Sequence, residues 1–416
     1  MSGDPQLIRR LGTGDAVVIG LGSMVGAGVF AAFAPAARAA GAGLLIGLVL
    51  AAAVAYSNAT ASAQLAAEYP ESGGTYVYGR KRLGPWWGFL AGWGFVVGKT
   101  ASCAAMALTF AAYAVPPEWR RATAVAAVLV LTAVNYRGIT RTAGLTRVLV
   151  AVVLVALGLG VVASLAGGDP DPSRLTPWTD GTSAYGVLQS AGLLFFAFAG
   201  YARIATLGEE VRDPERTIPR AIPLALGLAV GVYAVVAVTL LLTLGPQRIA
   251  DSAAPLATAV GSGTWDAWTP VVRVGAATAS LGALLALIAG IGRTTLAMAR
   301  EGDLPRWLAV VHPRYRVPHH AELVLAAVVC LLVLTVDLRG AIGFSSFGVL
   351  LYYVVANLAA FTQPAERRRW PRALQVAGAA GCLLLVATLP WTAVATGAAV
   401  FAVGALYRAA RLRLAR

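Results

Sequence analysis

The chain has 416 residues, of which 58% are hydrophobic and only 12% are charged, and its mean hydropathy is +0.72. This composition excludes an ordinary soluble domain and indicates a polytopic helical membrane protein. The formal net charge is +14, but the arginines lie in short loops beside apolar segments. Because the positive-inside rule explains that placement, we expect no nucleic-acid partner.

Apolar segments of about twenty residues recur along the chain, each long enough to cross about 30 Å of hydrocarbon. They predict about twelve transmembrane helices in a single domain over residues 1–416, with no soluble domain between them. The expected spans are 15–38, 41–66, 84–113, 121–137, 145–166, 184–206, 219–244, 265–298, 320–338, 340–362, 373–388 and 391–409.

The first expected span is rich in glycine at its centre, with Gly20, Gly22, Gly26 and Gly28 in the stretch GLGSMVGAGVF. Glycine weakens a helix and lets the backbone open, which a membrane tolerates where the backbone lines a cavity. A close helix–helix contact between small residues explains the same pattern equally well.

The third expected span carries a lysine, Lys99, near its middle. Of the 33 basic residues in the chain, only Lys81 and Lys99 are lysines. An ionisable side chain at that depth costs several kcal/mol on insertion, which favours a functional interpretation over a lysine that reaches up to the headgroups. Burial disfavours the charged form of lysine, so Lys99 can exchange a proton near neutral pH, as a buried arginine cannot.

The sixth expected span contains the sequence Ala197-Phe198-Ala199-Gly200 at mid-depth. Interruptions in the first and sixth spans are typical of two five-helix repeats of opposite orientation, here 15–166 and 184–362, followed by two additional helices in 373–409. The two breaks are then expected to meet at the bilayer midplane. Free N–H groups at one break suit an anion and free carbonyls at the other suit an ammonium, so the zwitterionic backbone of an amino acid satisfies both.

The loops are asymmetric in charge. One side of the twelve-span arrangement carries most of the arginine-rich segments: Arg9–Arg10, Arg80–Arg82, Arg137 with Arg141, Arg212–Arg220, Arg300–Arg316, Arg367–Arg372 and Arg408–Arg416. The other side has Arg38, Arg120, Arg121, Arg174, Arg248 and Arg339. The asymmetry predicts that both termini are cytoplasmic.

Neither the cysteines nor the histidines form a metal-binding pattern. Cys103, Cys330 and Cys382 are scattered through apolar spans, and the histidines at 312, 319 and 320 gather in one loop beside Pro313 and Pro318. We therefore expect no metal and no cofactor. No Ser/Lys, Asp/Asp or His/Glu set converges within the spans, which argues against an intramembrane enzyme.

Four segments, 20–41, 68–93, 195–222 and 293–318, together resemble the amino acid–polyamine–organocation transporter superfamily, in the right order and over nearly the whole chain. The third reads FFAFAGYARIATLGEEVRDPERTIPRAI and the fourth RTTLAMAREGDLPRWLAVVHPRYRVP. The resemblance implies the LeuT-type fold, with ten core helices in two inverted repeats plus two more. It also implies a secondary transporter that works by alternating access in the plasma membrane.

The resemblance also implies a substrate site. The carboxylate-binding turn of the first span falls on Met24, Val25, Gly26, Ala27 and Gly28. In the sixth span the aromatic gate falls on Phe196, and the carbonyls that bind the amine fall on Ala197, Phe198, Ala199 and Gly200. The side-chain pocket falls on Tyr201, Val96, Lys99 and Thr100. Core packing remains the alternative for Phe196 and Phe198.

Two departures from the family bear on coupling. Several proton-coupled members have a lysine in the fifth span, where Val153 stands here, and sodium-coupled members supply hydroxyls from the eighth span, where 283–293 has no Ser or Thr. A hard cation needs several oxygen ligands, so a sodium site is poorly equipped. We expect proton coupling through Lys99, with direct recognition of an anionic substrate and a fixed structural cation as its other possible roles.

The alternative function is an uncoupled exchanger of amino acids, amines or polyamines. The absence of an acidic residue deep in the implied site argues against a polyamine. The sequence does not specify the transported side chain, the direction of transport or the oligomeric state.

Overall fold

A computed structural model describes residues 11–71, 73–138, 143–176 and 182–414. Within these residues the chain is helical, and β pairing is limited to one isolated bridge between Leu11 and Val211. Four arginines of the charge argument, Arg9, Arg10, Arg141 and Arg416, lie outside the described residues.

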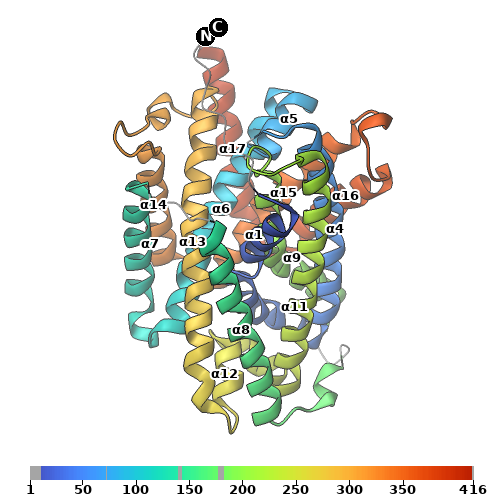
Figure 1. The fold of residues 1–416 in the computed structure, drawn as a ribbon, viewed down its shortest axis with the longest axis vertical. Helices are drawn as coiled ribbons and strands as arrows, with labels where there is room; N and C mark the ends of the chain where they lie inside the picture. Colours follow the sequence, from blue (N-terminus) through green and yellow to red (C-terminus); the bar gives the residue numbers. More distant parts are fainter. Residues whose placement is uncertain (1–10, 72, 139–142, 177–181, 415–416) are drawn as a thin grey trace.

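The helices form an elongated bundle (Figure 1). Those of the first half are α1 (Thr13–Met24), α2 (Ala27–Ala31), α3 (Phe33–Ala40), α4 (Leu44–Glu68), α5 (Thr75–Leu83), α6 (Pro85–Ala114), α7 (Arg120–Tyr136) and α8 (Ala143–Gly167). Those of the second half are α9 (Ala184–Phe198), α10 (Ala202–Ala205), α11 (Pro214–Asp251), α12 (Pro255–Gly261), α13 (Thr269–Arg300), α14 (His319–Thr335), α15 (Leu338–Phe361), α16 (Arg372–Thr388) and α17 (Trp391–Leu414).

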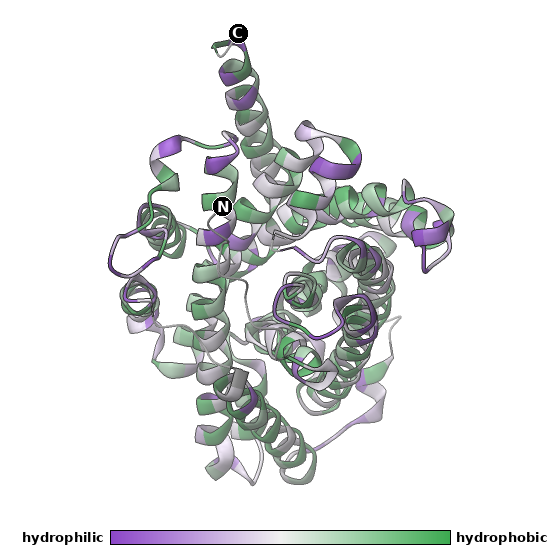
Figure 2. Ribbon diagram, turned by 45° about the horizontal axis from the view of Figure 1, so that its top comes forward, coloured by the Kyte–Doolittle hydropathy of each residue, from purple (hydrophilic) through white to green (hydrophobic). Residues whose placement is uncertain are grey.

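Nine segments of the described chain are long and apolar enough to cross a membrane: Thr13–Ala31, Phe33–Glu68, Pro85–Ala114, Gly144–Gly167, Ala184–Ala205, Pro214–Asp251, Asp266–Arg300, Leu338–Phe361 and Trp391–Leu414. They confirm a polytopic helical membrane protein. The remaining expected spans correspond to α7, α14 and α16, which have 17 residues each. Figure 2 shows the helices mainly hydrophobic and the hydrophilic residues mainly in the connecting loops.

The centre of the bundle is built around α6, which packs most extensively against α15 and α13. Glycines allow the close approach of α6 and α15, because a Cβ on Gly348 would lie 2.9 Å from the Cα of Gly98. A Cβ on Gly94 would lie 2.8 Å from the carbonyl oxygen of Gly348. Small residues at such a contact let two helix backbones pack directly, and this packing buries the part of α6 that carries Lys99.

Two short helices, α5 and α12, were not expected, because neither has the length of a membrane span. The helix α5 is tied to the end of α13 by the buried carboxylate of Asp303, which accepts hydrogen bonds from Tyr76 at 2.9 Å and Arg80 at 3.0 Å. Burial, together with the Asp303 carboxylate, raises the pKa of Tyr76 above its usual range, so the phenol keeps its proton as the donor. Arg408 of α17 also donates to Asp303.

The two ends of the described chain lie toward the same end of the bundle. Leu11 donates its N–H to the carbonyl oxygen of Glu210, in the loop between α10 and α11. That loop and the end of α17 are both at the top of Figure 1, opposite α12.

Candidate functional site

The first expected break lies in the predicted turn. The helix α1 ends at Met24, and α2 begins at Ala27 after Gly26 takes up a non-helical conformation, with φ −73° and ψ −133°. The residues from Met24 to Gly28 are all buried. Because α2 starts afresh, the first N–H groups of its backbone have no partner within the helix.

The second break is shorter and later than expected. Ala197 and Phe198 still belong to α9, and the interruption is a 3₁₀ turn over Ala199–Tyr201 that leads into α10. The expectation that the backbone opens from Ala197 onward is therefore wrong for the first two residues. The only glycine in this stretch is Gly200, and a 3₁₀ turn tightens the helix instead of unwinding it.

The two breaks contact each other through their glycines. A Cβ on Gly28 would lie 2.6 Å from the Cα of Ala197, and a Cβ on Gly200 would lie 2.3 Å from the carbonyl oxygen of Ser23. In both cases the obstructing atom is backbone, which cannot rotate away. The glycines are therefore required for this close approach of the first and sixth spans.

A tyrosine of the seventh span bridges the breaks and was missed by the sequence analysis. The hydroxyl of Tyr233, in α11, lies 2.6 Å from the carbonyl oxygen of Met24 and 2.8 Å from that of Ala197. Tyr233 is 1% exposed, and its ring lies 5.0 Å from that of Phe198. The sequence feature that could have indicated this role is that Tyr233 is the single tyrosine between Pro214 and Asp251, in an otherwise apolar span.

Lys99 reaches the second break. Its Nζ donates to the carbonyl oxygen of Ala199 at 3.3 Å, and the side chain is 7% exposed. The other lysine, Lys81, forms an ion pair with Glu71 at 2.6 Å, whereas Lys99 forms none with the residues that the structure describes. A proton-coupling lysine and a fixed structural cation would both make this bond, so the bond is compatible with either role.

The remaining residues of the implied site divide into two groups. On α6, the hydroxyl of Thr100 donates to the carbonyl oxygen of Val96 at 2.7 Å, one turn away. In the sixth span, Phe198 and Tyr201 are fully buried, and the ring of Tyr201 lies 5.3 Å from that of Tyr353 in α15. Phe198 and Tyr201 thus pack against rings from other helices, and Lys99 is the residue whose side chain bonds α6 to the break.

Phe196 is also buried, with 7% of its side chain exposed. It lies in α9 just before Ala197, whose carbonyl oxygen bonds to Tyr233. Its position beside the break suits a gate and suits core packing equally.

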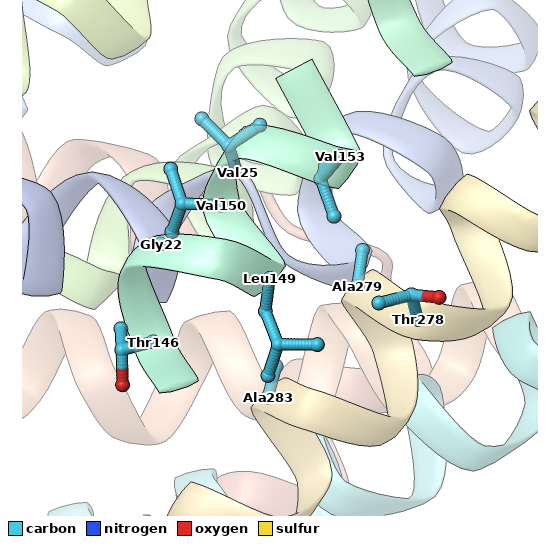
Figure 3. Close-up of a pocket in the computed structure, with 9 residues that line it drawn as sticks. All are labelled: Gly22, Val25, Thr146, Leu149, Val150, Val153, Thr278, Ala279 and Ala283. Carbon is cyan, nitrogen blue, oxygen red and sulfur yellow. The ribbon is translucent and has the colours of Figure 1, made fainter. Parts of the chain in front are cut away.

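A small cavity lies beside the first break, between α1, α8 and α13 (Figure 3). Its volume is about 20 Å³, room for roughly one water molecule. Val25 and Val153 line it, as do Thr278, Ala279 and Ala283 of the eighth span. The eighth-span residues that line the cavity therefore lie mostly before the segment 283–293, in which the sequence analysis found no Ser or Thr. Only Ala283 belongs to both.

The side chains around the cavity offer few oxygen ligands. Of the nine described residues that line it, only Thr146 and Thr278 have a side-chain oxygen, and in Figure 3 both hydroxyls point away from the aliphatic groups between them. Na⁺ and other hard cations require several oxygens. The side chains around the cavity therefore supply at most two of these oxygens, and any others would have to be backbone carbonyls.

Comparison with known proteins agrees with a transport function. The family model for amino acid permeases matches residues 15–413. An uncharacterised transporter of Mycobacterium tuberculosis is 62% identical over 399 residues, which cover 96% of this chain and 90% of that protein. A branched-chain amino acid permease of Bacillus subtilis is 24% identical over 94% of this chain and 90% of its own length. A cationic amino acid transporter of Arabidopsis thaliana is 29% identical over 86% of this chain and 66% of its own length. The matched proteins are transporters and not enzymes.

Proposed function

The chain belongs to the amino acid permease family, within the amino acid–polyamine–organocation superfamily, and from this premise we propose that it is a proton-coupled amino acid transporter of the plasma membrane. It works by alternating access, with twelve spans, inverted repeats over 15–166 and 184–362, two further helices in 373–409, and both termini in the cytoplasm. Its partners are the amino acid, protons and membrane lipid.

The substrate backbone binds between the two breaks. Its α-carboxylate accepts from free N–H groups at Ala27 and Gly28, where α2 begins, and its α-ammonium donates to carbonyls of the segment Ala197–Gly200. The opposite polarities of a helix start and of backbone carbonyls support this orientation. In this structure Tyr233 and Lys99 are the donors to the carbonyls of Ala197 and Ala199, and the ammonium of the substrate takes their place. The closeness of the two breaks at Gly28 and Gly200 supports it too, because both ends of one small zwitterion must be reached at once. The breaks move apart in the transport cycle to admit the substrate.

The observation that carries the coupling proposal is the bond from Lys99 Nζ to the Ala199 carbonyl oxygen at 3.3 Å. A protonated Lys99 links α6 to the sixth-span break, and a deprotonated Lys99 can no longer donate a charge-assisted bond. Loss of the proton therefore weakens the bond that holds the third span to the sixth. The scarcity of side-chain oxygens around the cavity of Figure 3 supports protons over sodium as the coupling ion.

The substrate is a neutral amino acid. Val96, Phe196 and Tyr201 are apolar or aromatic, and none of the residues assigned to the site is acidic. A cationic side chain would have to be desolvated near Lys99 without a countercharge, which is costly. The site therefore suits a branched-chain amino acid, as in the name of the Bacillus subtilis relative, better than a cationic amino acid, as in the name of the Arabidopsis thaliana relative.

Transport in proteoliposomes tests the proposal. The wild type should take up leucine when the outside is made acidic, arginine should compete poorly, and sodium should have no effect. Lys99→Ala should lose the response to the pH gradient. Lys81→Ala removes the other lysine, whose partner Glu71 lies outside the site, and should behave as the wild type.

Three results would overturn parts of the proposal. If Lys99→Ala still accumulates leucine in response to the pH gradient, Lys99 does not couple protons. Arginine keeps the positive charge but cannot lose its proton, so a Lys99→Arg protein that still responds to the pH gradient would show that Lys99 is a structural cation. If uptake needs sodium, proton coupling is wrong as a whole. If no ion gradient drives uptake but internal amino acid does, the protein is the uncoupled exchanger.

A further inference from the structure

A second, larger cavity lies far from the helix breaks. Its volume is about 340 Å³, within the usual range for small-molecule sites. It is a partly open hollow lined by the end of α6, the start of α7, the segment that contains α12, and the start of α13. Ala112 at its wall and Lys99 are on the same helix, roughly 20 Å apart at 1.5 Å per residue. The cavity is therefore separate from the Lys99 contact and lies at the α12 end of the molecule (Figure 1).

The polar groups of the cavity are cationic or hydroxylic. Two arginines, Arg120 and Arg273, line it together with the hydroxyls of Ser252, Thr258, Ser262 and Thr269. The other lining residues are alanines and one glycine. No carboxylate is present among the described residues that line the cavity, and the exposed Glu118 and Asp266 lie outside the lining.

Two donors at the cavity are buried without a partner. Among the described residues, no hydrogen-bond partner is found for the Nε of Arg120 or the hydroxyl of Thr269. Arg273 is exposed, donates from Nη1 to the carbonyl oxygen of Tyr113 at 3.5 Å, and keeps further N–H groups of its guanidinium at the cavity. Buried donors are normally satisfied, so the Nε of Arg120 and the hydroxyl of Thr269 indicate a ligand that accepts hydrogen bonds.

By contrast, the hydroxyls of the α12 segment are satisfied locally. The hydroxyls of Ser252 and Thr258 form a hydrogen bond with 2.7 Å between their oxygens, and the hydroxyl of Ser262 donates to the carbonyl oxygen of Thr258 at 2.7 Å. The unsatisfied donors thus come from the opposite wall, formed by α7 and α13. Arg120 and Thr269 are the first residues of these two helices, where the partial charge of the helix dipole is also positive.

We propose that this cavity is a binding site for a small oxyanion, either inorganic phosphate or the carboxylate of a small organic acid. Guanidinium groups recognise both through paired N–H donors, and Thr269 adds a hydroxyl donor. The site does not depend on the proposed transport function, and in the proposed topology it faces the outside of the cell.

Equilibrium dialysis of the purified full-length protein in detergent tests this proposal, with radiolabelled phosphate and radiolabelled acetate in a constant chloride background. At least one of the two anions should bind saturably. Arg120→Gln and Arg273→Gln should each weaken that binding at least tenfold, and Thr269→Val should weaken it several-fold without changing the charge. Arg121→Gln is the matched control, because Arg121 is the next residue, is exposed and donates to Leu334 outside the cavity; it should bind as the wild type does.

The anion that binds identifies the source: phosphate alone indicates an inorganic ligand, and acetate indicates an organic acid. The proposal is overturned if neither anion binds saturably, if both cavity arginines can be replaced without loss, or if Arg121→Gln weakens binding as much as they do. Size-exclusion profiles that match the wild type, obtained for each variant, separate loss of the site from loss of the fold.

Discussion

Replacing Tyr233 by phenylalanine removes one oxygen atom from the contact between the two helix breaks. The ring and its packing against Phe198 remain, so no cavity forms. The lost hydroxyl lies 2.6 Å from the Met24 carbonyl oxygen and 2.8 Å from that of Ala197. Since it has one hydrogen, the variant loses one net hydrogen bond and leaves buried carbonyls without their donor, which costs about 1–3 kcal/mol.

We therefore expect Tyr233→Phe to lower the free energy of unfolding by about 2 kcal/mol, roughly a thirtyfold change in the unfolding equilibrium. Denaturant titration of the purified protein in detergent measures this value. Tyr56→Phe is the matched control: Tyr56 is 43% exposed in α4, and its variant should stay within about 0.5 kcal/mol of the wild type. A Tyr233→Phe protein as stable as the Tyr56→Phe protein would refute the assignment of Tyr233 as the bridge.

Three other predictions concern the site, the α5 end and the topology. Gly28→Val should abolish amino acid binding, measured as the ligand-induced rise in melting temperature, because its side chain would meet the backbone of Ala197; undiminished binding would contradict the proposed site. Asp303→Asn should lower the free energy of unfolding by about 3 kcal/mol, since it leaves Arg408 buried without its carboxylate; a denaturation midpoint equal to that of the wild type would exclude this. A reporter that is active only outside the cytoplasm, fused after Arg416, should be silent in intact cells, and a signal would reverse the topology.

The positions of the long helices could be predicted from the sequence because hydrophobicity alone determines them. The expected span 84–113 and the helix Pro85–Ala114 nearly coincide for this reason. The short helices α5 and α12 could not be found in the same way, since neither has the length of a span. Their places depend on contacts with distant residues, such as that between Arg80 and Asp303.

The candidate site was predictable only in part. Glycines locate the first break, because no other residue permits the contact at Gly28. The sixth span has one glycine in its critical stretch, and the sequence could not distinguish a 3₁₀ turn at Ala199–Tyr201 from a wider opening. Tyr233 was missed because a single tyrosine in an apolar span is usually a core residue. The bond from Lys99 to Ala199 joins positions 100 residues apart, and only tertiary packing determines it.

The carboxylate of Asp303 also sets an order of assembly. Arg408 follows Asp303 by 105 residues, so at 5–20 residues per second the ribosome takes roughly 5 to 20 s to supply it. During that interval Tyr76 and Arg80, both already synthesised, are the donors available to the carboxylate. Arg408 of the last helix then adds a third donor to a carboxylate that Tyr76 and Arg80 already hold in place.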